Sequence, residues 1–230
     1  MTPAAERPDA GAEDVRPGAE AWVPAAADLD ALRSAAPGCR GCELYRDATQ
    51  VVFSSGGAAA RLMLVGEQPG DREDLEGEPF VGPAGRLLDR ALDAAGIPRG
   101  DAYLTNAVKH FRFELRGKRR IHAKPAVAHV VACRPWLEAE FDVVRPRVVV
   151  CLGATAARAV VGSAVRIGEV RGRVLEEDRS GRPLPAPTVV TEHPSAVLRL
   201  RERPVREAAF ARLVDDLAAA AEVAEGSSAR

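Results

Sequence analysis

Apolar positions along the chain alternate between short continuous runs and runs with helical spacing. The runs RLMLV (61–65) and RVVVCL (147–152) each end at a glycine, which predicts buried strands that feed loops. GRLLDRALDAA (85–95) has helical spacing and stops at Gly96 and Pro98. The same criteria predict further strands over 102–108, 165–176 and 187–191, and helices over 126–144 (interrupted near Pro135), over ATAARAVVG after Gly153, and over 204–223.

Strands that alternate with helices predict an α/β domain with a largely parallel sheet. In such sheets, ligands bind at the carboxyl ends of the strands. Three loops are expected to leave strands at that edge, over 66–80, 106–124 and 192–198, and they carry nearly every unusual residue of the chain.

The length of 230 residues suits one well-buried domain, and 47% hydrophobic with 28% charged residues is ordinary globular composition. No apolar run approaches the roughly 20 residues that span a membrane. The N-terminal segment lacks an apolar signal core and is rich in Ala, Pro, Asp and Glu. We therefore expect a disordered acidic tail over 1–24, one domain over 25–225, a monomer, and a cytoplasmic location.

The formal net charge of −1 hides one acidic and one basic segment. Between 67 and 78 the charged residues include a single base, and between 109 and 124 they include a single acid. Such runs are usually solvated surfaces. Phe111 and Phe113 interleave with the basic run, however, a pattern typical of segments that bind phosphates and stack on bases.

The chain has four cysteines, Cys39, Cys42, Cys133 and Cys151, of which the first two form a C-x-x-C pair. In a cytosolic protein this favours a metal site over disulfides. Thiolates fit either zinc or an iron–sulfur cluster, and the spacing does not decide between them. Such a site would be structural, because it would tie the N-terminal segment to a helix and a strand. In the alternative interpretation, Cys133 and Cys151 are ordinary core residues.

Four features in order carry a family resemblance: the four-cysteine pattern and the motifs GEQPGDREDLEGEPFVGPAGRLL, YLTNAVKHF and TEHPSAVLR. They extend from Cys39 to the C-terminal helix and resemble the family 4, iron–sulfur uracil-DNA glycosylases. The resemblance implies a three-layer α/β sandwich with a central, mainly parallel sheet. It also implies excision of uracil from DNA, single-stranded or with the base flipped from a duplex, and a [4Fe–4S] cluster on the four cysteines.

Two departures from the ordinary family 4 pattern resemble the X-type subgroup, which stays covalently joined to DNA after excising uracil. They are Gln68 with Asp71 in the first motif, and the inserted segment RGKRRIHAKP. The resemblance implies that the histidine of KRRIH, His122, bonds to C1′ of the deoxyribose. An uncharged imidazole is a competent nucleophile, and we expect Glu67 to accept its other N–H and orient it.

The remaining site residues follow from base excision, in which negative charge builds on uracil and positive charge on the sugar. Phe80, in a Gly/Pro-rich loop, is expected to stack on the flipped base rather than to pack in the core. Asn106 offers a donor and an acceptor to N3–H and O4 of uracil, with turn-capping as its alternative role. His193 is expected to donate to O2, and Ser195 to hold a phosphate.

The roles of five charged or amide side chains are less direct. Asp71 and Gln68 are expected beside the sugar, and Arg120 is expected to fix its loop or a phosphate. Glu73 and Asp74 are expected to be ordinary solvated acids. Without the resemblance, a histidine in an arginine-rich loop is usually a phosphate contact, and one beside a proline is usually a packed loop residue.

Three other functions fit parts of the sequence. An ordinary family 4 glycosylase would use water and release an abasic product without needing His122. A non-catalytic, metal-stabilised DNA-binding module would share the basic loop and the cysteines, but it has no need for Glu67, Asn106 and His193 at three strand ends. A redox protein would use the cluster for electron transfer, although no second cofactor motif accompanies it. The X-type enzyme ranks first.

Overall fold

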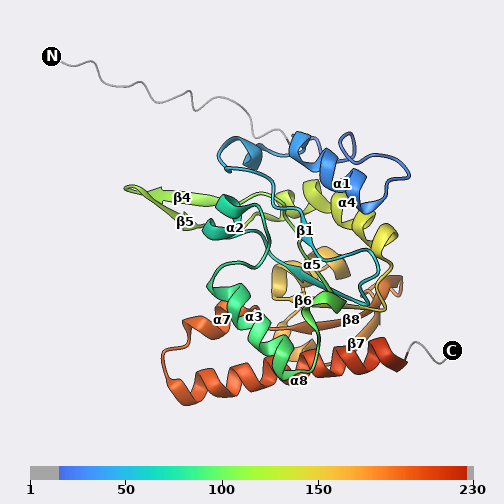
Figure 1. The fold of residues 1–230 in the computed structure, drawn as a ribbon, viewed down its shortest axis with the longest axis vertical. Helices are drawn as coiled ribbons and strands as arrows, with labels where there is room; N and C mark the ends of the chain where they lie inside the picture. Colours follow the sequence, from blue (N-terminus) through green and yellow to red (C-terminus); the bar gives the residue numbers. More distant parts are fainter. Residues whose placement is uncertain (1–15, 227–230) are drawn as a thin grey trace.

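A six-stranded, mainly parallel sheet forms the centre of the computed structural model, which describes residues 16–226 (Figure 1). The strand order is β1-β3-β2-β6-β8-β7. The four parallel strands are β2 (Leu62–Gly66), β3 (Ala102–Asn106), β6 (Val148–Leu152) and β8 (Pro183–Thr191). The antiparallel edge strands are β1 (Ser54–Ser55) and β7 (Val174–Glu177).

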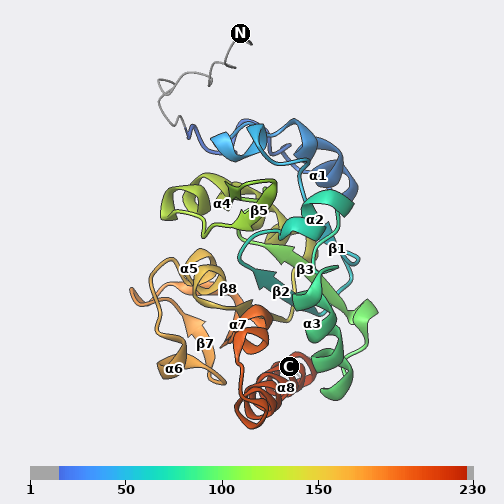
Figure 2. The same cartoon turned by 90° about the vertical axis from the view of Figure 1, so that its left-hand side faces the viewer.

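Successive side chains of the central strands enter opposite layers, as the two-residue period of a strand requires. In β2, Met63 and Val65 belong to one core cluster, and Leu62 and Leu64 belong to the other. The first cluster is completed by α1 (Leu29–Ala35), α4 (Val127–Val144) and α5 (Ala154–Val161), and the second by α3 (Pro83–Ala94) and α8 (Arg203–Gly226). Figures 1 and 2 show these two sets of helices on opposite sides of the sheet. The predicted α/β sandwich is confirmed.

Shorter elements complete the described chain. They are η1 (Ala36–Gly38), η2 (Glu43–Arg46), α2 (Asp71–Glu76), η3 (Arg99–Asp101), α6 (Ile167–Val170), α7 (Pro194–Arg199), β4 (Phe113–Arg116) and β5 (Arg119–His122). Two of them lie in segments that were predicted to be loops: α2 in 66–80 and α7 in 192–198. Both begin within a few residues of a strand end, where side chains of the predicted site are concentrated.

The basic segment is not a loop but an antiparallel hairpin of β4 and β5, which projects from the body of the molecule (Figure 1). Gly117 provides the turn with a left-handed φ of 61°, which glycine adopts without a steric penalty. The two strands, FELR and RRIH, contain too many charges to give a clear apolar alternation. The prediction of a loop was therefore wrong in a way that matters for His122, which lies on β5.

Helix α4 runs without the predicted interruption from Val127 to Val144, with Pro135 inside it. A proline removes one hydrogen bond from a helix interior. The same helix buries Trp136, Leu137 and Phe141 in the core, and such packing is the main source of helix stability in proteins. Tertiary packing therefore outweighs the local breaker.

The strand predicted over 165–176 is much shorter than expected, because only its last residues join the sheet as β7. Ile167 and Val170 of α6 and Val165 before it instead pack against the core, so their apolar character reflects partial burial rather than strand pairing. The strand predicted over 187–191 lies within the longer β8.

The folded unit begins earlier than the predicted start at residue 25. Residues 1–15 of the predicted tail lie outside the described residues. In the following segment, Ala19 is buried and Trp22 and Val23 pack against the core, while the Gly18 N–H donates to the Gly41 carbonyl at 3.1 Å. Among the helices in residues 16–226, none combines the length and apolar character needed to cross a membrane.

Candidate active site

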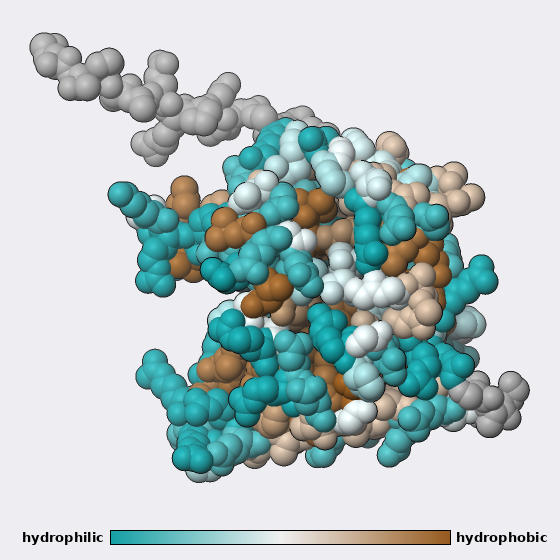
Figure 3. Space-filling view, viewed as in Figure 1, coloured by the Kyte–Doolittle hydropathy of each residue, from teal (hydrophilic) through white to brown (hydrophobic). Residues whose placement is uncertain are grey.

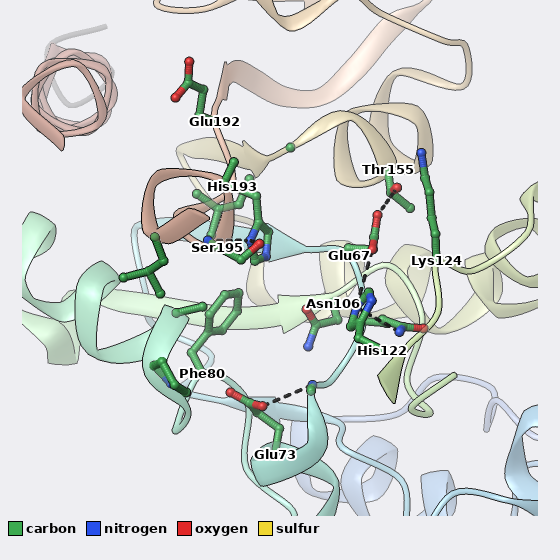
Figure 4. A pocket seen from close by; sticks show the side chains of 18 of the residues that line it. Glu67, Glu73, Phe80, Asn106, His122, Lys124, Thr155, Glu192, His193 and Ser195 are labelled. Atoms are coloured by element: carbon green, nitrogen blue, oxygen red, sulfur yellow. Dashed lines mark hydrogen bonds and ion pairs between the residues drawn. The ribbon is translucent and has the colours of Figure 1, made fainter. Parts of the chain in front are cut away.

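A pocket of about 640 Å³ opens at the carboxyl ends of the four parallel strands (Figure 4). Each strand end contributes a polar side chain to its wall: Glu67 follows β2, Asn106 ends β3, Thr155 follows β6, and His193 follows β8. The pocket lining includes eight of the nine catalytic and substrate-binding residues predicted from the sequence, namely Glu67, Gln68, Asp71, Phe80, Asn106, His122, His193 and Ser195. Arg120 is the exception.

Phe80 and Asn106 meet at the end of β2, where Gly66 leaves room for both. A Cβ at Gly66 would lie 2.7 Å from the Phe80 ring and closer still to the Asn106 amide oxygen, so the close approach requires glycine. Phe80 is buried and belongs to a core cluster while it lines the pocket, so the expectation that it would not pack in the core was wrong. Asn106 is also buried, and no hydrogen bond to its side-chain amide occurs within residues 16–226.

His193 is held as an uncharged imidazole. Burial, helped by the positive charge of Arg199, lowers the pKa of His193 to about 4. Its Nδ1 accepts a hydrogen bond from the Ser195 backbone N–H at 3.1 Å and lies 2.9 Å from the Ser195 hydroxyl. The ring proton of the neutral form is therefore on Nε2. The predicted phosphate contact, Ser195, is thus engaged in fixing the tautomer of His193.

Gln68 ties the base of the hairpin to the end of β2. Its Oε1 accepts from the Arg112 backbone N–H at 3.2 Å, and its Nε2 lies within 3.1 Å of the carbonyl oxygens of Arg112 and Ala123. These bonds orient the amide so that its NH₂ group also faces Nε2 of His122 at 3.0 Å. Gln68 was expected beside the sugar, but here it fixes the hairpin and contacts His122.

Glu67 lies between His122 and the first turn of α5 (Figure 4). Its Oε2 accepts a hydrogen bond from the Thr155 hydroxyl, and its Oε1 lies 3.6 Å from Nε2 of His122. This separation exceeds hydrogen-bond distance, and it involves the nitrogen that Gln68 also faces, so the expected bond to the other ring N–H is absent. Thr155 was missed from the sequence, where a hydroxyl two residues after Gly153 was the only signal.

Arg120 clamps the hairpin onto α2. Its Nε donates to Asp71 at 2.7 Å and its Nη1 to the fully buried Asp74 at 2.5 Å. Its guanidinium also lies over the rings of Phe111 and Phe113, 5.5 and 5.2 Å from their centroids. Burial lowers the pKa of Arg120, but the two carboxylates outweigh this effect and raise it. Arg120 thus fixes the loop, one of its two expected roles, and Asp71 pairs with Arg120 rather than pointing freely to the sugar site.

The expectation of solvated acids at Glu73 and Asp74 was wrong, because both are buried. The Glu73 carboxylate accepts from the backbone N–H groups of Gly70 at 3.1 Å and Gly82 at 2.8 Å, and Asp74 accepts from the Thr49 N–H. An acid three residues after the cap of a helix is a recognised start signal, and it could have indicated α2.

A sequence profile of the Uracil DNA glycosylase superfamily matches residues 53–218, a range that contains every residue of the pocket. The chain belongs to the uracil DNA glycosylase superfamily. Among its relatives, the type-4 uracil-DNA glycosylase of Archaeoglobus fulgidus is 36% identical over 171 residues, which cover 71% of this chain and 81% of the relative. That of Thermotoga maritima is 37% identical over 169 residues, covering 73% and 82%. That of Pyrobaculum aerophilum is 34% identical over 176 residues, covering 75% and 85%.

In this member of the uracil DNA glycosylase superfamily, all four cysteines are free, buried and part of one core cluster. The Trp136 indole N–H donates to the Cys39 sulfur at 3.3 Å, and the Lys109 backbone N–H donates to the Cys133 sulfur at 3.3 Å. Burial raises the pKa of Cys42 to about 11 and that of Cys133 to about 12, so a thiolate in either place needs a compensating cation.

The donor set therefore has the chemistry of a thiolate metal site, with N–H groups directed at two of the sulfurs. Within residues 16–226, however, no three side chains of the metal-binding types converge closely enough to hold an ion. Cys39 and Cys42 also lie before the segment that matches the superfamily.

Proposed function

We propose that this protein is a uracil-DNA glycosylase that takes uracil out of a DNA strand, breaks its N-glycosidic bond and joins C1′ of the sugar to His122. The observation that carries the proposal is the convergence of His122, Glu67, Asn106 and His193 in one pocket from four separate segments. The type-4 uracil-DNA glycosylases among the relatives support the substrate.

Recognition of the base would use three side chains. The Phe80 ring provides a stacking surface, and the amide of Asn106, which no other described residue engages, pairs with O4 and N3–H of uracil. The Nε2–H of His193 donates to O2. When the bond between C1′ and N1 breaks, its electron pair leaves with uracil, and this donor stabilises the negative charge that spreads onto O2. Because burial keeps His193 neutral, the donor is in place at neutral pH.

The positive charge that develops on the sugar would be stabilised by the Glu67 carboxylate, whose Oε2 is held by Thr155. A lone pair of the neutral His122 ring then forms the bond to C1′. The other ring nitrogen gives up its proton to water and the uracil anion takes one up, which leaves a neutral, N-alkylated imidazole and free uracil. Such a product has no good leaving group, so the adduct is stable.

A second candidate is an ordinary glycosylase, in which water attacks C1′ and an abasic product is released. The 3.6 Å separation between Oε1 of Glu67 and His122 favours this candidate, because that oxygen accepts no hydrogen bond from the histidine and can accept one from water. Glu67 would then be the general base, and His122 would be dispensable.

A denaturing gel of the protein mixed with a uracil-containing oligonucleotide separates these two candidates. We expect a heat- and detergent-resistant shifted band that disappears with thymine and in His122→Ala. Arg206→Ala, which removes a charge from the exposed beginning of α8, is the control and should retain the band. Free uracil with an abasic product and no shifted band would make the protein an ordinary glycosylase, and neither product would refute both candidates.

We also propose that Cys39, Cys42, Cys133 and Cys151 hold a [4Fe–4S] cluster with a structural role. When bound, the cluster would supply the cation that the buried thiolates need and would tie the N-terminal segment to α4 and β6. The purified protein should be brown and contain iron, and Cys133→Ser should lose colour, iron and thermal stability together. A colourless, zinc-loaded protein would contradict this assignment.

A further inference from the structure

The outer part of the hairpin carries an apolar side chain that nothing covers. Leu115 is 68% exposed, the largest exposed fraction among the large apolar side chains of residues 16–226. In a two-stranded antiparallel sheet, residues that face each other across the strands share one side. Phe113 pairs with His122 and Leu115 pairs with Arg120, so these four side chains lie on the same face of the hairpin.

The two ends of this face differ. At its base, the Phe113 ring packs 5.2 Å from Phe111, and His122 lines the pocket. Arg120 anchors the middle of the face to α2 through Asp71. Leu115 lies directly opposite Arg120, about 7 Å along the hairpin from the level of His122, and unlike Arg120 it stays exposed. The hairpin is thus fixed in place while its outer apolar position stays open to solvent.

The charges around Leu115 indicate which kind of molecule could bind over its side chain. Arg116, Lys118 and Arg119 are all exposed at the turn, and within residues 16–226 no carboxylate lies within ion-pair distance of any of them. Figure 3 shows the hairpin projecting beside a hollow, with apolar and hydrophilic side chains together on its surface. An apolar position framed by three unneutralised cations complements a chain that offers both phosphates and flat apolar faces, as a DNA strand does.

We propose that the hairpin is a second DNA-binding element, in which Leu115 packs on the base of a nucleotide next to the uracil that occupies the pocket. Arg116, Lys118 and Arg119 bind the phosphates of the same strand. The inference rests on the proposed function, because the pocket sets where the uracil lies and therefore which nucleotide reaches Leu115. Flipping one nucleotide exposes a face of the neighbouring base. Packing of that face against Leu115 removes both apolar surfaces from water.

The test measures DNA affinity without cleavage, by fluorescence anisotropy with an oligonucleotide that carries a 2′-fluorinated deoxyuridine. The electron-withdrawing fluorine slows departure of the base. We expect Leu115→Ala to weaken binding about five- to tenfold, and Leu115→Phe to bind at least as tightly as the wild type. Val174→Ala is the matched control, because Val174 is also exposed but lies on β7, an edge strand of the central sheet. This variant should bind DNA as the wild type does.

Replacing the base on either side of the uracil by an abasic spacer then identifies the contact. When the spacer replaces the base that Leu115 contacts, the affinity of the wild type should fall by the same factor as in Leu115→Ala. The affinity of Leu115→Ala should not fall further with that spacer. Arg119→Ala should instead weaken binding to every oligonucleotide and lower the slope of log affinity against log salt by about one.

Unchanged binding by Leu115→Ala would overturn the proposal, and so would a loss that is equally large with both spacers, because that loss would be structural. Uracil release by the wild type, measured separately, tests the proposed function by itself. A protein that binds uracil and thymine oligonucleotides equally and releases no base would refute that function, whether or not Leu115 contributes to binding.

Discussion

Thr155 holds the Glu67 carboxylate through a single hydroxyl, which lets one substitution isolate the effect of orientation. Thr155→Val keeps the shape of the side chain and removes the hydrogen bond. We expect uracil excision to slow about tenfold, equivalent to ~1.4 kcal/mol of barrier, because the carboxylate is then free to rotate away from the sugar. Single-turnover release of uracil measures this effect.

Thr155→Ser is the matched control, because it restores the hydroxyl and should recover most of the rate. A merely structural role for Thr155 would make the serine variant as slow as the valine variant, with a melting temperature that falls in parallel. Equal rates for wild type and Thr155→Val would show that Thr155 does not position Glu67.

Burial lowers the pKa of both His193 and His110 to about 4, and this depression makes stability depend on pH. In the unfolded chain a histidine titrates near 6.5, so between pH 6.5 and 4 the unfolded state binds more protons than the folded state. The folded state is therefore most stable above about pH 6.5. As the pH is lowered from 6.5 towards 4, the free energy of unfolding decreases by about 1.4 kcal/mol per histidine for each pH unit. Urea unfolding at pH 7.0 and 5.5 should show a smaller loss in His110→Gln than in the wild type. An equal loss in the two proteins would contradict the assignment.

At the scale of elements, the position of the hairpin depends on one guanidinium. Arg120 donates to Asp71 and Asp74 of α2 at once, a forked geometry that a lysine cannot reproduce. Arg120→Ala and Arg120→Lys should therefore both loosen β4 and β5 and make the basic turn, which is already exposed, more mobile. Limited trypsin digestion should cleave both variants at Lys118 or Arg119 several times faster than the wild type. Protection in Arg120→Lys equal to that of the wild type would show that a single charge suffices.

The β4–β5 hairpin could not be predicted from the sequence, whereas several other elements could. The strands β2 and β6 and the helix α3 were predictable, because their apolar period is local and is followed by a glycine. The hairpin was not, because charges dominate its strands and its position depends on contacts of Arg120 with residues 46 and 49 positions away.

The candidate site shows a similar division. Motifs supplied Glu67, Asn106 and His193, because functional side chains follow the ends of strands. Thr155 lies 88 residues from its partner Glu67, so no local pattern joins the two. The sequence identified Gln68 as a site residue, but it did not predict the hydrogen bonds to the backbone at the base of the hairpin, because these depend on the tertiary fold.

At the scale of the whole molecule, a buried ion pair joins α4, the helix that carries Cys133, to the segment that follows β3, the strand that ends at Asn106. Lys109 Nζ lies 2.5 Å from Oε2 of Glu140, with side chains 1% and 0% exposed. Oε1 of Glu140 accepts from the Tyr103 hydroxyl at 2.9 Å and from the Thr105 hydroxyl at 2.7 Å. One carboxylate of α4 thus fixes both ends of the short segment that presents Asn106.

Glu140→Ala should destabilise the fold by about 3–5 kcal/mol, because it leaves the Lys109 ammonium buried without a partner. Replacing both charges, in Lys109→Met with Glu140→Leu, should recover part of that loss but not all of it. The Tyr103 hydroxyl would still lack its acceptor, at about 1–3 kcal/mol, whereas the Thr105 hydroxyl can still donate to the Phe53 carbonyl. Urea unfolding of the two variants beside the wild type measures the difference, and a double variant no more stable than Glu140→Ala would contradict the ion-pair account. If stability recovers in the double variant while uracil binding does not, the pair acts on Asn106 through the orientation of its segment and not only through the stability of the fold.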